Sequence, residues 1–91
     1  MRKAVIVSTI MHSSRDAIQT AERIGKAVRQ ARKEMGVDQQ ELALVASVSR
    51  RTVYAIEHGK PTARLDAVVA VLAALGLELA TVERAQRRRE P

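Results

Sequence analysis

The sequence predicts one all-α domain of four helices, and three observations support this prediction. The chain has 91 residues, enough for a single hydrophobic core. Hydrophobic residues make up 46% of it, yet it contains no Phe, no Trp and one Tyr, so aliphatic side chains must fill that core. Apolar residues also recur every three to four positions in successive segments, which is the spacing of helices that bury one face.

The first helix is expected to begin after Thr20, a good N-cap residue, and to end at Gly36. The apolar positions between them are spaced by four, three and four residues: Ile24, Val28, Ala31 and Met35. This spacing puts all of these side chains on one face of the helix. Residues 1–19 are therefore predicted to form an arm before the domain, which spans 20–76, and the arm contains a β-branched run over 5–10.

The second helix is predicted to begin after Asp38. Glu41, three residues later, completes a capping box, in which each of the two side chains accepts a hydrogen bond from the backbone of the other residue. The buried positions of this helix are expected at Leu42, Val45 and Ala46.

Only two residues separate this helix from a third, whose N-cap is Ser49. Two helices joined by so short a turn must cross steeply. Ala43 is small enough to let the two backbones approach each other, and Val53 and Ile56 are expected to point into the core. The third helix is expected to end at 58–61, because Gly favours the conformation after a helix and Pro cannot continue one.

A fourth helix is predicted over 63–75, and nearly all of its side chains are apolar. A single small domain covers one side of such a helix, so we expect the other side to meet a second copy of the chain. Residues 77–83 alternate like a strand, which needs a partner for its backbone groups. The same strand of a second copy is the preferred partner, and 5–10 is the alternative. The predicted homodimer contacts are Val71, Leu72, Leu75, Leu77, Leu79 and Val82.

The charge of the chain favours a polyanionic partner. Sixteen Lys and Arg against ten Asp and Glu leave a formal net charge of +6. Such a charge favours nucleic acid first and a membrane surface second. Residues 84–91 are rich in Arg and are expected to form a basic, flexible tail, which is either solvated or used to grip DNA or a protein partner.

Several other classes of protein are excluded. The chain has no Cys, so disulfides, thiolate metal sites and cysteine nucleophiles are absent. Its two His lack the spacing of metal ligands, and His58, at a helix end, is expected to interact with the helix dipole. No nucleophile motif or phosphate-binding Gly loop is present, so we expect no catalytic residue, no metal and no cofactor. The apolar run over 4–11 loosely resembles an export signal, but Ser8 and Thr9 interrupt it and no cleavage site follows. A soluble, cytoplasmic protein without a membrane partner is therefore expected.

The outward face of the third helix carries the side chains best suited to reading DNA. The predicted base contacts are Arg50, Arg51, Thr52 and Ala55. An Arg can donate two hydrogen bonds to guanine, and a Thr or Ala methyl group can pack on thymine. A second set is expected to contact phosphates: Gln39, Ser49, Tyr54, Lys60 and Arg64. The alternatives are that the two arginines form a solvated face and that Tyr54 packs at the edge of the domain.

Three segments, 37–43, 48–53 and 56–60, resemble the Cro/C1-type (XRE) helix-turn-helix family, and the likeness covers about 24–75. Within that family, 60–66 and 72–79 are most similar to the HipB-type antitoxins. The resemblance implies an all-α, lambda-repressor-like fold of four to five helices and a homodimeric repressor that binds a palindromic operator in double-stranded DNA. It also implies an antitoxin that represses its own operon and binds a HipA-type Ser/Thr kinase toxin. A stand-alone regulator without a toxin, and an interaction module that has lost DNA binding, are the alternatives.

The resemblance further implies a structural ion pair between Arg32 and Glu57, which ties the first predicted helix to the third. The chain departs from the family pattern at two positions. Ser47 stands where the family usually has Gly, so a left-handed backbone at this turn would cost roughly 1 kcal/mol. Ala55 stands where related phage repressors often have a long polar residue, which shifts base reading onto the two arginines before it.

Overall fold

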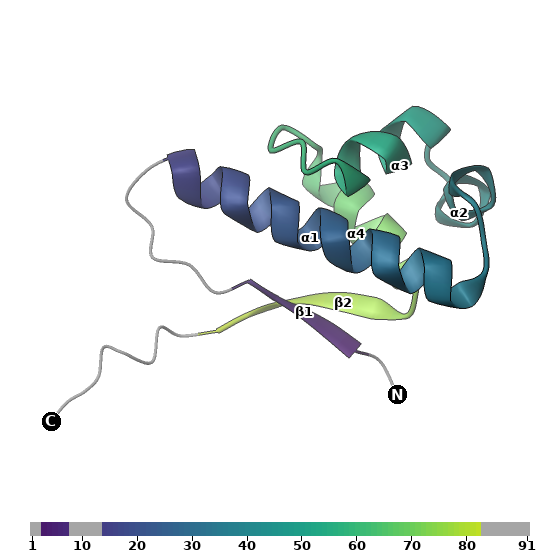
Figure 1. Ribbon diagram of the computed structural model, residues 1–91, viewed down its shortest axis with the longest axis horizontal. Helices are drawn as coiled ribbons and strands as arrows, with labels where there is room; N and C mark the ends of the chain where they lie inside the picture. The colour runs from purple at the N-terminus through teal and green to yellow at the C-terminus, as the bar shows by residue number, and fades with distance from the viewer. Residues whose placement is uncertain (1–2, 8–13, 83–91) are drawn as a thin grey trace, which may run out of the picture.

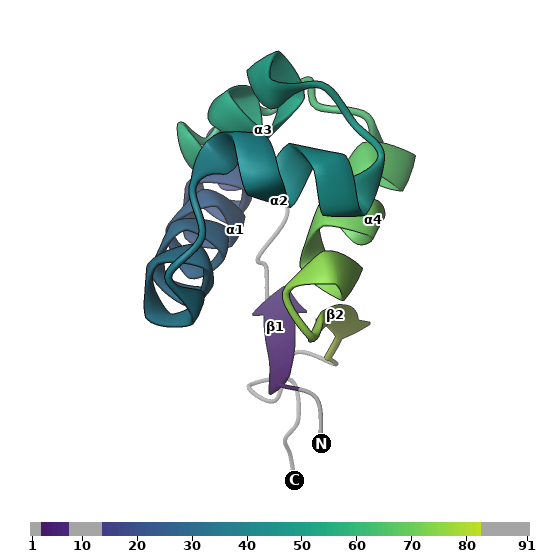
Figure 2. The ribbon, with the colours of Figure 1, turned by 90° about the vertical axis from the view of Figure 1, so that its right-hand side faces the viewer.

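The computed structural model describes residues 3–7 and 14–82. In chain order they form β1 (Lys3–Val7), α1 (Ser14–Met35), α2 (Gln39–Ala46), α3 (Arg50–Glu57), α4 (Leu65–Ala74) and β2 (Leu77–Thr81) (Figure 1). The two strands lie on the side of the molecule opposite α3 (Figures 1 and 2). The predicted fold class, a small helical domain with a short C-terminal strand, is confirmed. The predicted tail, 84–91, lies outside the described residues.

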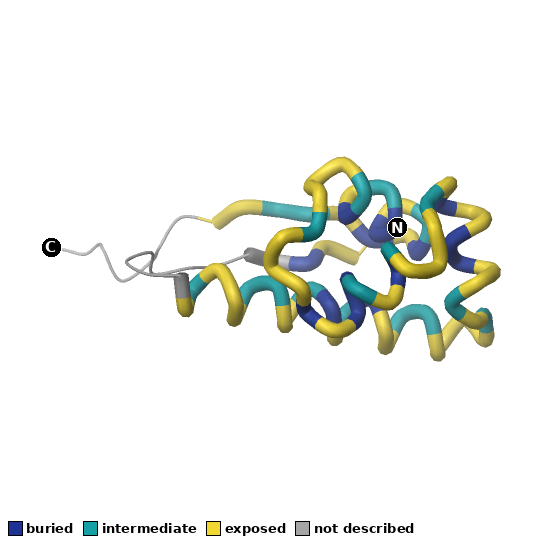
Figure 3. The backbone as a smooth tube through the Cα atoms, turned by 90° about the horizontal axis from the view of Figure 1, so that it is seen from above, coloured by how far each residue is buried: buried dark blue, intermediate teal, exposed yellow. Residues whose placement is uncertain are grey.

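Helix α1 is longer than predicted, because it begins at Ser14 and not after Thr20. The added residues contain neither Gly nor Pro, and Asp16 in the first turn interacts favourably with the positive end of the helix dipole. Exposed positions alternate with intermediate or buried ones along α1 (Figure 3). Val28 is fully buried, as its spacing predicted, whereas Met35 is exposed.

The predicted caps are present on both sides of the tight turn. The backbone N–H of Glu41 donates to the Asp38 carboxylate and the backbone N–H of Asp38 donates to the Glu41 carboxylate, both at 2.8 Å. The hydroxyl of Ser49 accepts a hydrogen bond of 3.0 Å from the backbone N–H of Thr52. Between these two caps Ser47 adopts a left-handed conformation, with φ 59° and ψ 41°. The turn therefore has the geometry that usually requires glycine.

The buried face of α2 differs from the prediction at one position. Leu42 and Ala46 are buried as expected, but Val45 is 71% exposed and Ala43 is buried in its place. Helix α2 packs against both α3 and α4, and the side that meets them carries Leu42, Ala43 and Ala46, so Val45 is turned to the outside. The prediction was wrong because the spacing of apolar residues alone did not say which side of α2 meets its neighbours.

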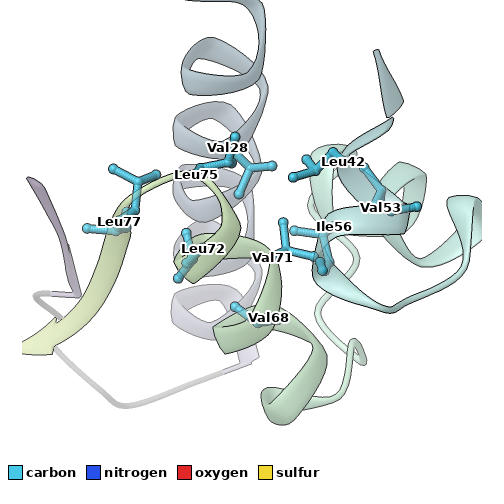
Figure 4. Close-up of a cluster of buried hydrophobic side chains, with 12 residues drawn as sticks. Val28, Leu42, Val53, Ile56, Val68, Val71, Leu72, Leu75 and Leu77 are labelled. Carbon is cyan, nitrogen blue, oxygen red and sulfur yellow. The ribbon is translucent and has the colours of Figure 1, made fainter. Parts of the chain in front are cut away.

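The core gathers side chains from all four helices and both strands. Val28, Val53, Val71 and Leu72 have no exposed surface, and Ile56 lies beside them (Figure 4). Val53 and Ile56 point inward from α3, as predicted. Burial of one such side chain stabilises the fold by about 1.5–3 kcal/mol, so these positions hold α3 with its opposite face outward.

Strand β2 pairs with β1 of the same chain, in parallel, with Val5 opposite Leu79. This corrects the preferred expectation, in which 77–83 pairs with a second copy. The partner is 3–7, which overlaps the alternative segment 5–10 at 5–7. The four helices between the strands carry the chain back to its starting side, so β2 returns parallel to β1. Val5 is buried against the core, and one edge of β2 is satisfied within the chain. The other edge of β2 is unpaired among the described residues.

Four of the predicted dimer contacts are buried within their own chain, so their side chains do not form a surface for a second copy. These four side chains are at most 8% exposed and fill the core of their own chain: Val71, Leu72, Leu75 and Leu77. Of the other two, Leu79 is half-buried and Val82 is exposed. Helix α4 does keep an uncovered apolar side, at Leu65 and Val69.

The left-handed turn residue leads to a prediction about stability. Replacement of Ser47 by Gly should raise the free energy of unfolding by about 1 kcal/mol, because Gly adopts this conformation without the clash of a Cβ atom. Urea unfolding followed by circular dichroism measures the change. Ser47→Ala is the matched control, because it keeps the clash and should leave the stability nearly unchanged. A Gly variant no more stable than the parent chain would contradict the prediction.

Candidate nucleic-acid interface

Helix α3 turns one face away from the core, and the predicted base contacts lie on it. Arg50 and Arg51 are exposed, and Thr52 and Ala55 are half-buried. The inward face of α3 is held by the core, and the sheet lies at the far side of the molecule (Figures 1 and 2). The outward face is therefore free to meet a large partner.

A hollow of about 230 Å³ lies between α3, the loop that follows it and the start of α4. Five of the predicted DNA contacts line it: Arg51, Thr52, Ala55, Lys60 and Arg64. The loop adds Thr62. This residue was not predicted as a contact, although it lies close to Lys60 in the sequence. Three cations around one concave surface create a positive potential that favours an anionic partner.

Four of the five predicted phosphate contacts make hydrogen bonds or ring contacts within the described residues, and for Ser49 and Tyr54 these contacts lie within α3 and its two ends. The Ser49 hydroxyl caps α3 and also lies 2.9 Å from the hydroxyl of Thr52. The Tyr54 ring stacks on the ring of His58, with 3.9 Å between the centroids. The Nδ1 of His58 donates a 2.9 Å hydrogen bond to the carbonyl of Tyr54, so His58 does satisfy the end of its helix. Tyr54 remains half exposed beside the basic residues of α3.

The cations of this surface differ in whether a carboxylate forms an ion pair with them. Arg64 donates two hydrogen bonds to the Asp66 carboxylate, at 3.1 and 2.9 Å, and both side chains are exposed. These bonds lower the pKa of Asp66 below its ordinary value. Within the described part of the chain, no carboxylate forms an ion pair with Arg50, Arg51 or Lys60. These three side chains therefore present their full charge to a partner.

An ion pair between α1 and α3 orients this surface. Arg32 donates to both carboxylate oxygens of Glu57, through Nε at 2.5 Å and a terminal nitrogen at 3.1 Å. Its other terminal nitrogen donates to the carbonyl of Val37, at 3.0 Å. The amide nitrogen of Gln39 also donates to Glu57, at 3.1 Å, so this predicted phosphate contact is engaged inside the chain. One carboxylate thus joins α1, the start of α2 and the end of α3.

The same contacts set the ionisation of Glu57. Burial raises the pKa of this carboxyl, but the hydrogen bonds from Arg32 and Gln39 together with the charge of Arg32 outweigh it, so the pKa of Glu57 is lowered. Hydrogen bonding to Glu57 raises the pKa of Arg32 in turn. The pair is therefore charged at neutral pH.

A glycine whose packing role was not predicted lets α1 approach α3. A Cβ atom on Gly25 would lie 2.4 Å from the carbonyl oxygen of Ile56 and 2.8 Å from that of Glu57. Any side chain at this position would push the two helices apart and pull Glu57 away from α1. In the sequence Gly25 was noted only within the segment that resembles the helix-turn-helix family, because nothing in its own helix shows why glycine is required there.

The described residues hold neither a metal site nor a membrane span. No group of three or more His, Cys, Asp or Glu side chains in 3–7 and 14–82 is arranged to hold a metal ion. No helix in those ranges has the length and apolar character needed to cross a bilayer.

Two capped helices joined by a tight left-handed turn, with the second helix presenting a basic face, define a helix-turn-helix domain. The helix-turn-helix family profile matches residues 28–82, and the chain belongs to this family. The chain is also similar to a protein described as the uncharacterized HTH-type transcriptional regulator y4mF of Sinorhizobium fredii (strain NBRC 101917 / NGR234). The two are 42% identical over 72 residues, which cover 79% of this chain and 95% of that relative.

The lowered pKa of Glu57 leads to a prediction about pH. Because the carboxyl is stabilised in its charged form in the folded chain, it contributes stability above its ordinary pKa of 4.5, and this contribution is lost as the pH falls through the lower folded value. Thermal unfolding measures the free energy of unfolding at pH 7 and at pH 3. The difference between these two values should be smaller for Glu57→Gln than for the parent chain. At pH 7 the variant should lose about 1–3 kcal/mol of unfolding free energy. Glu34→Gln, at an exposed carboxyl of α1, is the control. An unchanged pH dependence in Glu57→Gln would contradict the assignment.

Proposed function

We propose that the protein is a sequence-specific transcriptional repressor that binds double-stranded DNA through α3. The observation that carries this proposal is the hollow on the outer side of α3, because it brings two arginines, a lysine and two threonines to one exposed surface. The exposed arginines at the first turns of α3 match the part of a recognition helix that meets base edges in the major groove. The name of the relative from Sinorhizobium fredii, an HTH-type transcriptional regulator, supports the same function.

The side chains divide into two roles in this proposal. Arg50 and Arg51 read guanine, while the methyl groups of Thr52 and Ala55 pack against thymine. Lys60 and Arg64 lie beyond α3 on the rim of the hollow and bind phosphates together with Ser49, Tyr54 and Gln39. The rim residues set the orientation of the domain, and the residues of α3 select the sequence.

The repressor acts as a homodimer on a palindromic operator. Two features support a second copy: the unpaired edge of β2 and the exposed Val82 that follows this strand. Both lie on the side of the molecule away from α3, so a two-fold assembly through them leaves both reading faces free (Figure 2). Two such faces enter successive major grooves when they are about 34–36 Å apart.

A narrower role as the antitoxin of a kinase toxin rests on the likeness of 60–66 and 72–79 to HipB-type antitoxins. Such a protein binds its own promoter and also a HipA-type Ser/Thr kinase encoded beside it. A stable complex with the product of a neighbouring kinase gene supports this role, and DNA binding without such a gene identifies a stand-alone regulator.

The division of roles on the DNA surface predicts different losses for two variants. Arg50→Ala should lose about 1–3 kcal/mol of binding free energy at one base position of the operator and little elsewhere. Lys60→Ala should weaken binding to all sequences alike and reduce the salt dependence of log K by about one. Fluorescence anisotropy with a set of single-base operator variants, selected from a random pool, measures both effects.

The control for both variants is Lys26→Ala, which removes an exposed cation of α1 outside the hollow. It should change neither the base preference nor the salt dependence. Equal losses on every duplex for Arg50→Ala would refute base reading by this residue. Binding of the parent chain to its operator no tighter than to random duplex would refute the proposed function.

The proposed dimer predicts an effect of charge at the end of β2. Val82→Glu should raise the dimer dissociation constant by about tenfold or more, because an unpaired carboxylate would be buried between the copies. Sedimentation equilibrium measures this constant. Leu44→Glu, at an exposed residue of α2, is the control and should leave it unchanged. Equal effects of the two variants would contradict an interface beside β2.

A further inference from the structure

A second concave surface lies on the other side of the loop that follows α3. This groove has a volume of about 300 Å³ and runs between the first half of α1, the loop, the start of α4 and β2. Its walls are aliphatic, with Ala17 and Ile24 from α1, Leu65 and Val68 from α4, and Leu79 from β2. A cavity of this size with apolar walls is at the lower end of the range that holds small molecules. None of the proposed base contacts reaches it.

Lys60 is the charged member of the groove's lining among the described residues. It is exposed, and in the part of the chain that the structure describes its ammonium group has neither an ion pair nor a hydrogen bond. Lys60 also lines the hollow on the outer side of α3. A single ammonium group thus borders two concave surfaces, one apolar and one facing the proposed DNA partner.

We infer that the groove binds a free aliphatic carboxylate, such as a medium-chain fatty acid. The chain of the ligand packs against the apolar walls, and its carboxylate lies at Lys60, which supplies the complementary charge. The ligand must have one anionic end and an apolar body, because the described lining offers one cation and otherwise mainly aliphatic surface. The net charge of +6 further favours an anion over a neutral or cationic ligand of the same shape.

Binding of this ligand would weaken DNA binding, because Lys60 cannot serve a ligand carboxylate and a DNA phosphate at once. This regulatory step rests on the proposed function, whereas binding of the carboxylate to the groove does not. Loss of one phosphate contact should lower the salt dependence of log K for DNA by about one. The ligand would act through competition for one side chain, so no change of fold is required.

The first experiment measures ligand binding without DNA. Decanoate, below its micelle-forming concentration, is titrated into the ¹⁵N-labelled full chain and followed by NMR. The expected result is saturable binding at one site, with shifts of the backbone amides concentrated at Ala17, Ala21 and Ala63 around the groove. 1-Decanol, which has the same chain without the charge, should bind about three- to fivefold more weakly.

Three variants locate the site. Ala17→Leu adds a side chain at an exposed helical position on the groove wall and should abolish decanoate binding without changing the thermal unfolding temperature by more than a few degrees. Lys60→Gln should weaken decanoate about three- to fivefold and leave 1-decanol unchanged. Lys26→Gln, which removes a cation of α1 outside the groove, is the matched control and should bind decanoate like the parent chain.

Several results would overturn the inference. These are the absence of saturable binding, equal binding of decanoate by Lys60→Gln and the parent chain, and shifts centred on the exposed Leu44 and Val45 of α2. Contacts from a second copy that fill the groove at NMR concentrations would also overturn it. If decanoate binds as expected but does not weaken DNA binding of the parent chain, the regulatory step fails while the ligand site stands.

Discussion

The carboxylate of Glu57 is the contact on which the geometry of the DNA-facing surface depends. Helix α3 has eight residues, and an isolated helix shorter than about 12–15 residues is only marginally stable in water. Its position must therefore come from its neighbours. Glu57 in its last turn is held by Arg32 of α1 and Gln39 of α2, and removal of any of these groups would leave buried charge or polarity without a partner.

Close approach of the helices makes this contact possible. Gly25 lets α1 approach the last turn of α3, and Ala43 occupies a buried position where α2 meets its neighbours. At the turn between α2 and α3, Ser47 adopts a left-handed conformation that L residues with a side chain rarely adopt. The strain persists because the caps at Asp38 and Ser49 and the buried faces of both helices fix the two ends of the turn. The crossing of the two helices is thus set jointly by small residues and by capping.

The parallel pairing of β1 with β2 places the sheet on the side of the molecule away from the basic face of α3 (Figure 2). Pairing inside the chain buries Val5 against the core and leaves the other edge of β2 and the exposed Val82 on the side away from α3. The basic residues of α3 and the loop after it are gathered on the opposite side. Any association through the sheet can therefore occur without covering the cations. Among the described residues Lys60 and Ala63 line both the basic hollow and the apolar groove, and Lys60 is the charged one of the two.

The sequence by itself determined the features that depend on neighbouring residues: the helical class, the caps at Asp38 and Ser49, the tight turn and the inward positions of Val53 and Ile56. Each follows from spacing or from a hydrogen bond that closes within one turn. Only the tertiary structure decided which face of α2 is buried, which strand pairs with β2, and that the last residues of α4 belong to the core of their own chain. These outcomes depend on contacts between segments far apart in the sequence, and periodicity identifies an apolar face without identifying what will cover it.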